Sequence, residues 1–146
     1  MIAEALMLIV IASGPELPAP IQIGPKQHNG QSLYRGKYFV KAHESVRKCI
    51  RHRESKGDYR AVSATGKHRG AYQVSPAMAV GMGWNVQREL SGLVGKVRAR
   101  SIGEALRAHP ANQWGMYWQD MAFWITWNNG KGKHHWKATV PGTGCF

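Results

Sequence analysis

The chain has 146 residues, enough for one domain with a modest hydrophobic core. Its 20 Lys and Arg residues against 8 Asp and Glu residues give a net charge of +12, so we expect an anionic partner such as nucleic acid, an acidic membrane surface or a bacterial wall polymer. The basic residues form no run of five or six, which argues against a disordered nucleic-acid-binding arm.

Residues 1–14 contain an apolar run, Leu6–Ala12, that is too short to cross a membrane as a helix. It is similar to the hydrophobic region of a signal peptide, but the charge before it is Glu4, where such peptides carry basic residues. Three interpretations stay open: a cleaved signal, a signal that remains attached, or an anchor buried in a larger assembly. Residues 15–37 are rich in Pro, Gly, Gln and Asn and predict a surface linker, so the folded domain is expected over residues 38–146.

A first helix is predicted over residues 38–55, because apolar side chains recur there at steps of three and four residues. Glu54 closes this helix, and Gly57 is a stop signal. A carboxylate is unfavourable at that end, where the helix dipole places partial negative charge, and such local misfits are typical of functional positions. The alternative is an ordinary solvated acid, balanced by the basic residues around it.

The region after Gly57 predicts a small β-hairpin within residues 59–74, since short β-like runs alternate with Gly66 and Gly70. Four helices follow from capping residues and apolar periodicity. They are expected over residues 77–82, where Gly81 and Gly83 would end the helix, and over residues 85–97, 101–109 and 113–128. The last is apolar almost all round, which indicates a central buried helix.

The sequence offers little support for a metal, a nucleotide or a serine nucleophile. His134 and His135 are adjacent, so on an extended strand they would point apart, and no Cys or carboxylate lies at ligand spacing. The glycines around Lys67 lack the phosphate-loop pattern, and no Gly-x-Ser-x-Gly elbow occurs. We therefore expect neither a metal nor a cofactor.

Several short motifs occur in a definite order. They are Cys49, Glu54-Ser55-Lys56-Gly57-Asp58-Tyr59, Thr65-Gly66, Arg69-Gly70-Ala71-Tyr72-Gln73, Trp118-Gln119-Asp120-Met121-Ala122, Gly130, Trp136 and Cys145. This order resembles the lysozyme-like domain of resuscitation-promoting factors and related actinobacterial and phage transglycosylases, over residues 39–145. The chain departs from that pattern in the wider spacing between Cys49 and Glu54, in Lys56 where a glycine is common, and in a longer stretch over residues 85–110. The resemblance implies an α+β, mainly helical fold that is lysozyme-like with a small β-hairpin.

The resemblance also implies a site. Glu54 would be the catalytic acid, and Thr65 and Gln73 would line the substrate cleft. Tyr59 and Tyr72 are further candidates for substrate binding, although Tyr72 is equally well explained as a core residue.

The only cysteines are Cys49 and Cys145, and the resemblance implies that they form a disulfide. The bond would close a loop of nearly the whole domain, worth about 4–5 kcal/mol in the chain-entropy model. Such a bond suits an oxidising compartment, and the alternative is a pair of reduced, buried thiols.

Glycosidic cleavage needs a proton donor and usually a second carboxylate. Asp58 is a candidate, but only an unbroken helix would bring it beside Glu54. The resemblance implies instead that the 2-acetamido group of the substrate attacks the anomeric carbon, so that one acid suffices. In a lytic transglycosylase that acid then takes the proton of the 6-hydroxyl, leaving a 1,6-anhydro end. Burial would favour the protonated acid, and Arg51 would oppose it if its side chain points the same way, while Arg53 and Ser55 are expected to project elsewhere.

The expected partners are peptidoglycan glycan strands, anionic cell-wall polymers and, for a phage protein, tail proteins, whereas nucleic acid is not expected. The corresponding location is extracellular, at the cell wall, or on a virion. One rival function is a non-catalytic cationic module that binds cell wall or nucleic acid. A third possibility, a virion structural protein whose N-terminal segment docks into a tail, is compatible with the enzyme.

Overall fold

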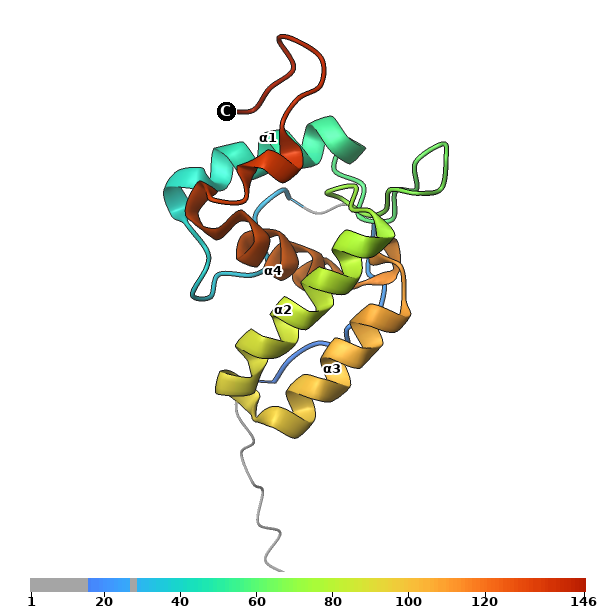
Figure 1. Cartoon of the computed structure of the whole chain (residues 1–146), viewed down its shortest axis with the longest axis vertical. Coiled ribbons are helices and arrows are strands. Elements are labelled where there is room, and N and C mark those ends of the chain that lie inside the picture. Colours follow the sequence, from blue (N-terminus) through green and yellow to red (C-terminus); the bar gives the residue numbers. More distant parts are fainter. Residues whose placement is uncertain (1–15, 27–28) are drawn as a thin grey trace, which may run out of the picture.

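The computed structural model describes residues 16–26 and 29–146, and helices dominate this part of the chain (Figure 1). The elements are α1 (Glu44–Ser55), α2 (Pro76–Val94), α3 (Lys96–Ala108) and α4 (Met116–Trp127), with 3-10 turns η1 (Lys41–His43), η2 (Ala111–Gln113), η3 (Asn128–Gly130) and η4 (Lys133–Trp136). The predicted mainly helical fold is confirmed. None of the helices in the described ranges combines the length and hydrophobicity needed to cross a bilayer. The apolar segment predicted over residues 1–14 lies outside the described residues.

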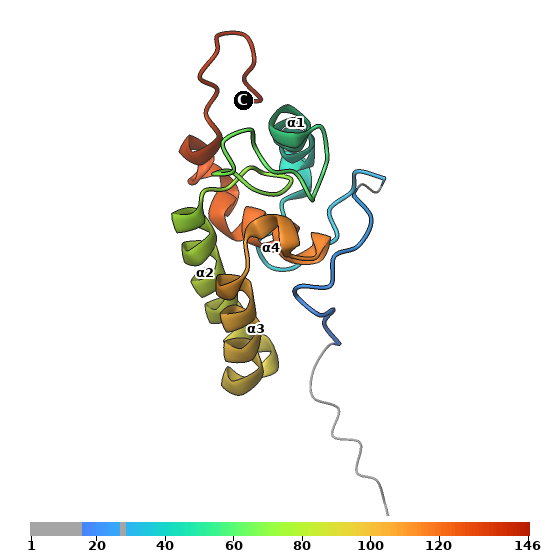
Figure 2. The same ribbon diagram turned by 90° about the vertical axis from the view of Figure 1, so that its right-hand side faces the viewer.

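Helix α4 lies at the centre of the core, as its all-round apolar pattern predicts. It is placed between α1 and the hairpin of α2 and α3 (Figures 1 and 2). The ring of Phe123 on α4 lies 4.6 Å from the ring of Tyr72 and 4.7 Å from that of Trp136, measured between centroids. These contacts join the loop before α2 and the C-terminal segment to the same helix.

Helix α2 continues through Gly81 and Gly83, where the sequence predicts a break. Gly83 serves the packing of two helices instead: a Cβ there would lie 2.7 Å from Cγ of Arg107 on α3. Gly103 of α3 has the same role, since its Cβ would lie 2.7 Å from Cβ of Gln87. The absence of side chains at these two positions lets α2 and α3 approach closely, which local helix propensity does not reveal.

The break between these helices falls at Gly95, whose φ of 87° is left-handed. Val97, predicted to share the buried face of the preceding helix, therefore belongs to α3 and is 87 % exposed. Helix α3 also begins earlier than the predicted residues 101–109.

For α1 and α4, the C-terminal ends lie closer to their predicted positions than the N-terminal starts do. Helix α1 ends at Ser55 as predicted, and Lys56 with φ 55° adopts the left-handed cap ahead of Gly57. It begins only at Glu44, after a 3-10 turn. Helix α4 begins at Met116 and not at residue 113, because the chain first forms the turn η2.

Residues 59–74 contain no regular strand. They form two isolated antiparallel bridges, Val62 with Arg69 and Arg69 with Val74. The segment thus folds back on itself at the position where the hairpin is predicted, with fewer ladder bonds than a hairpin has.

The described part of residues 15–37 runs over the surface of the helices and is attached to them. The carbonyl of Pro20 accepts a hydrogen bond from the backbone N–H of Gly115 at 2.7 Å, and the carbonyl of Lys26 accepts one from that of Tyr59 at 3.0 Å. Tyr34 is buried in the core. These contacts fix the segment against the domain.

A buried polar network holds α1 against α4. The carboxylate of Asp120 on α4 accepts hydrogen bonds from the hydroxyls of Tyr59 at 2.6 Å and Tyr72 at 2.5 Å. Arg47 on α1 lies 3.7 Å from the same carboxylate, donates to the Tyr72 hydroxyl at 2.9 Å, and pairs with Glu44. The network fixes the angle of α1 and hence the position of its C-terminal end.

Candidate active site

Glu54 lies at the C-terminal end of α1, on the wall of a groove of about 480 Å³. One wall comes from α1 and the loop before α2, and the other from η4 and the C-terminal segment. The lining residues are Arg53, Glu54, His68, Gln73, His135, Trp136, Lys137, Ala138, Thr139, Val140 and Thr143. The Glu54 side chain is 28 % exposed, so its carboxylate is accessible from the groove.

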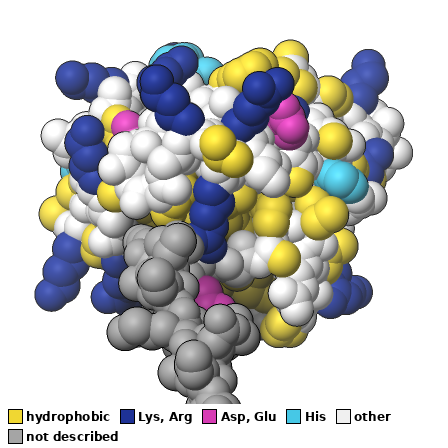
Figure 3. Space-filling model, turned by 90° about the horizontal axis from the view of Figure 1, so that it is seen from below, with side chains coloured by type: hydrophobic (Ala, Val, Ile, Leu, Met, Phe, Trp, Pro, Cys, Tyr) yellow, Lys and Arg dark blue, Asp and Glu magenta, His cyan; other side chains and the backbone are white. Residues whose placement is uncertain are grey.

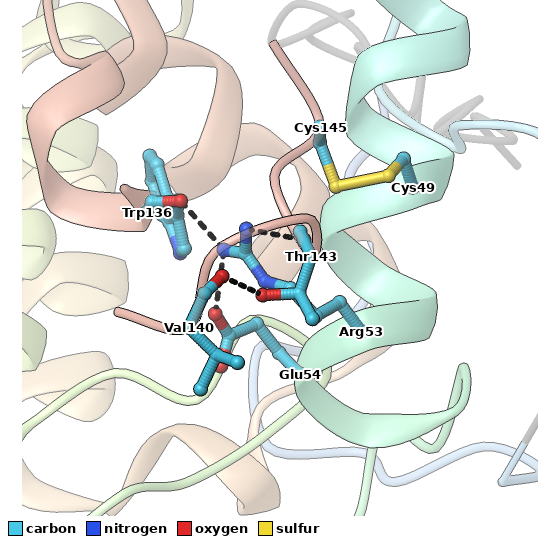
Figure 4. Close-up of a disulfide and its surroundings, with 7 residues drawn as sticks. All are labelled: Cys49, Arg53, Glu54, Trp136, Val140, Thr143 and Cys145. Carbon is cyan, nitrogen blue, oxygen red and sulfur yellow. Dashed lines mark hydrogen bonds and ion pairs between the residues drawn. A yellow bond between two sulfur atoms is a disulfide. The ribbon is translucent and has the colours of Figure 1, made fainter. Parts of the chain in front are cut away.

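The carboxylate of Glu54 pairs with Arg53, contrary to the expectation that Arg53 projects elsewhere. Nη2 of Arg53 lies 2.9 Å from Oε1 of Glu54 and also donates to the carbonyl of Trp136 at 2.6 Å (Figure 4). The C-terminal segment, which the helical pattern cannot place, draws the guanidinium to this side. Arg51 would oppose protonation of Glu54 only if it pointed the same way, and it lies over the ring of Tyr59, with Cζ 5.6 Å from the centroid.

Ser55 projects away from the groove as predicted, because its hydroxyl donates to the carbonyl of Ala71 at 2.8 Å. This bond ties the end of α1 to the loop before α2. The neighbours of Glu54 therefore have different roles: Arg53 contacts the acid, and Ser55 fixes the helix end that carries it.

The predicted disulfide between Cys49 and Cys145 is present, with the Cα atoms 5.7 Å apart. It attaches the C-terminal segment to α1 one turn before Glu54 (Figure 4). Thr143 turns this segment back by donating its hydroxyl to the carbonyl of Val140 at 2.6 Å. The disulfide thus helps to position the second wall of the groove.

Gln73 and Glu54 line the same groove. Gln73 has a left-handed φ of 48°, and its side-chain amide donates to the carbonyl of Gly70 at 2.9 Å. Thr65 is not among the lining residues. It lies on an exposed turn, where its hydroxyl contacts that of Ser63 at 3.2 Å.

Tyr59 and Tyr72 lie in the core rather than in the groove. Their exposed fractions are 2 % and 3 %, and both hydroxyls donate to the buried Asp120. Burial raises the pKa of both phenols above its usual value, and the adjacent carboxylate raises it further. In this structure neither ring is accessible to a sugar, so the predicted substrate contact is replaced by a structural one.

Glu54 is the only acid among the described residues that line the groove. Asp58 follows the end of α1, and its carboxylate accepts a hydrogen bond from the backbone N–H of Arg60 at 2.8 Å, as in an Asx turn. Asp120 is fully buried and Glu44 pairs with Arg47. The groove therefore combines one carboxylate with several cationic or titratable groups.

The sequence does not predict a place in the groove for three of these groups, His68, His135 and Lys137. His68 belongs to the loop before α2, and the other two belong to the segment that the disulfide holds. Burial lowers the pKa of His135, and His134 lowers it further. The periodicity of the sequence carries no signal for these residues, because only the tertiary fold brings the two segments together.

The adjacent histidines lie on the 3-10 turn η4 and not on a strand. Their ring centroids are 4.1 Å apart, so the rings lie side by side rather than pointing apart as expected. Within residues 16–26 and 29–146, no cluster of three His, Cys, Asp or Glu side chains is arranged to hold a metal ion.

Comparisons of the chain with protein-family models, with curated proteins and with solved structures give no match. The function is therefore argued from the groove itself.

Proposed function

We propose that the chain is a lysozyme-like, peptidoglycan-cleaving enzyme, a glycoside hydrolase or lytic transglycosylase that acts on the MurNAc-GlcNAc backbone. The observation that carries this proposal is that Glu54, with an accessible carboxylate, is the one acid among the described residues that line a groove also containing Gln73. In this role Glu54 donates a proton to the glycosidic oxygen as the bond to the leaving sugar breaks.

A mechanism with one acid fits the residues that line the groove. No second carboxylate lines it among the described residues, and Asp58 is engaged in a turn. The 2-acetamido group of the substrate would then attack the anomeric carbon, so the nucleophile comes with the substrate. After the first step Glu54 is a carboxylate, the form that Arg53 at 2.9 Å stabilises. As a base it would accept a proton from the 6-hydroxyl or from water.

The charge of the protein supports an anionic polymer as the partner. The net charge is +12, and lysine and arginine side chains are spread over the face seen in Figure 3, near its centre as well as at its margin. Spread charges of this kind favour association with an anionic wall, where exposed attraction is screened over about 8–10 Å at physiological salt. The proposed location is accordingly extracellular, at the cell wall, or on a virion with phage tail proteins as partners.

Digestion of purified peptidoglycan followed by mass spectrometry tests the proposal. We expect muropeptides with either reducing or 1,6-anhydro ends, and the kind of end distinguishes the hydrolase from the transglycosylase. The rival non-catalytic module, which binds cell wall or nucleic acid, would sediment with the wall in a salt-dependent way and release no new ends. That result with correctly folded protein would overturn the proposal that the chain is an enzyme.

A further inference from the structure

A second groove, of about 240 Å³, lies on the other side of the loop before α2. Adjacent loop residues line different grooves: His68 and Gln73 line the groove of Glu54, whereas Arg69 and Val74 line the second one. The opposite wall of the second groove includes Arg107 from the end of α3. The two grooves thus share one loop as a partition.

Two arginines in this second groove have N–H donors that bind no acceptor in the described part of the chain. Arg69 donates through Nε to the carbonyl of Gly66 at 2.8 Å and through Nη1 to Asn112 at 3.3 Å. Arg107 donates through Nη1 to Gln87 at 2.8 Å. Neither arginine pairs with a carboxylate of the described chain, and in both Nη2 has no hydrogen-bond partner there. The groove therefore presents two guanidinium groups that are held in place and not neutralised.

An exposed indole adjoins one of these cations, Arg107. Trp84 on α2 is 51 % exposed and follows Val80, a residue of the groove, by one helical turn. The guanidinium of Arg107 lies over the indole, with Cζ 3.5 Å from the ring centroid, and Gly83 leaves room for its side chain. The cation thereby fixes the ring, while much of the indole remains open to solvent.

We propose that Trp84, Arg107 and Arg69 form a second glycan-binding site, for a sugar that carries an acidic group. The indole stacks against the apolar face of the sugar ring, and the two guanidinium groups donate hydrogen bonds to a carboxylate or a phosphate. This inference rests on the proposed function, because it takes wall glycan as the ligand. The site holds the polymer beside the groove of Glu54 without taking part in cleavage.

Binding of full-length protein to purified sacculi tests this site. The measurements use the Glu54→Gln background, so that the wall stays intact, with sacculi stripped of teichoic acid and with sacculi that retain it. We expect Trp84→Ala and Arg107→Gln each to weaken binding by about tenfold, the loss of one good contact. The matched controls are Leu93→Ala, an exposed apolar residue of α2, and Arg100→Gln, an exposed arginine of α3, and both should bind as the parent does.

Loss on the stripped sacculi identifies carboxylates of peptidoglycan as the ligand, and loss only where teichoic acid is present identifies its phosphates. Because Arg107 also packs against α2, the Arg107→Gln result is used only if the melting temperature of that variant is unchanged. If the melting temperature changes, Trp84→Ala alone tests the site. If it binds both preparations as Leu93→Ala does, the site does not exist. The readout is binding and not cleavage. The absence of this binding site would therefore not argue against the role of Glu54, and the absence of catalysis by Glu54 would not prevent the binding measurement.

Discussion

The guanidinium of Arg53 lies 2.9 Å from a carboxylate oxygen of Glu54, its neighbour in the chain. A charge-assisted contact at this distance holds the two side chains together. Arg53 is also bound to the carbonyl of Trp136 at 2.6 Å, so the C-terminal segment sets how closely it approaches Glu54. The position of the cation beside Glu54 therefore depends on the opposite wall of the groove.

Substitution Arg53→Gln should slow the cleavage of peptidoglycan. The amide keeps a donor for the Trp136 carbonyl but removes the charge that lies beside the Glu54 carboxylate. We expect the rate to fall by about tenfold, the size of the loss of one hydrogen bond to a charged group. Arg51→Gln is the control, since Arg51 lies over the Tyr59 ring. A loss with Arg51→Gln and none with Arg53→Gln would contradict the pairing described above.

The disulfide should contribute strongly to stability and to the shape of the groove. It joins residues separated by 96 positions, for which the chain-entropy model gives about 4–5 kcal/mol. Denaturant unfolding with and without reductant measures this difference. The double variant Cys49→Ser/Cys145→Ser should resemble the reduced protein and show no effect of reductant. Equal stability of the reduced and oxidised proteins would show that the bond does not constrain the fold.

The fold is predictable from the sequence where local signals and packing agree. The end of α1, the burial of α4 and the pairing of Cys49 with Cys145 follow from a stop signal, an all-round apolar pattern and a motif order. The break predicted at Gly81 and Gly83 is wrong, because these glycines lie within α2 and Gly83 makes room for Arg107 across the helix pair. Local propensity cannot distinguish a glycine that ends a helix from one that accommodates a neighbour.

The motif order indicates only part of the candidate site. Glu54 and Gln73 line one groove, whereas Tyr59 and Tyr72 donate hydrogen bonds to the buried Asp120. Nothing in the spacing of those tyrosines identifies the carboxylate that they contact, which lies on a helix far along the chain. Tertiary contacts of this kind decide whether an aromatic residue is available to a ligand.

Substitution Asp120→Asn should destabilise the protein markedly. Arg47 is completely buried, and removal of the charge 3.7 Å away leaves it with Glu44 as its remaining ion-pair partner. We expect a loss of about 3 kcal/mol in the free energy of unfolding, near the lower end for a broken buried pair. Glu104→Gln, which breaks the exposed pair with Arg100, should cost less than about 0.5 kcal/mol. Similar losses for the two variants would refute a structural role for the network.

Stability should fall in alkaline solution. Burial raises the pKa of Tyr59 and Tyr72 above the usual value of about 10, so the folded state retains protons that the unfolded state loses. The contribution is complete below about pH 10 and declines as the pH rises further. Urea unfolding across this range should show a steeper alkaline decline for the parent than for Tyr72→Phe. Identical slopes would mean that Tyr72 ionises as freely in the folded state as in the unfolded one.

The most direct test of the account compares the parent with Glu54→Gln on purified peptidoglycan, by mass spectrometry of the released ends. The substitution removes the proton and preserves the shape of the side chain, so the fold and the melting temperature should not change. A positioned acid commonly contributes about 10²–10⁴-fold to the rate, and we expect a loss of that size. Cleavage by Glu54→Gln within a few-fold of the parent would show that Glu54 is not the catalytic acid.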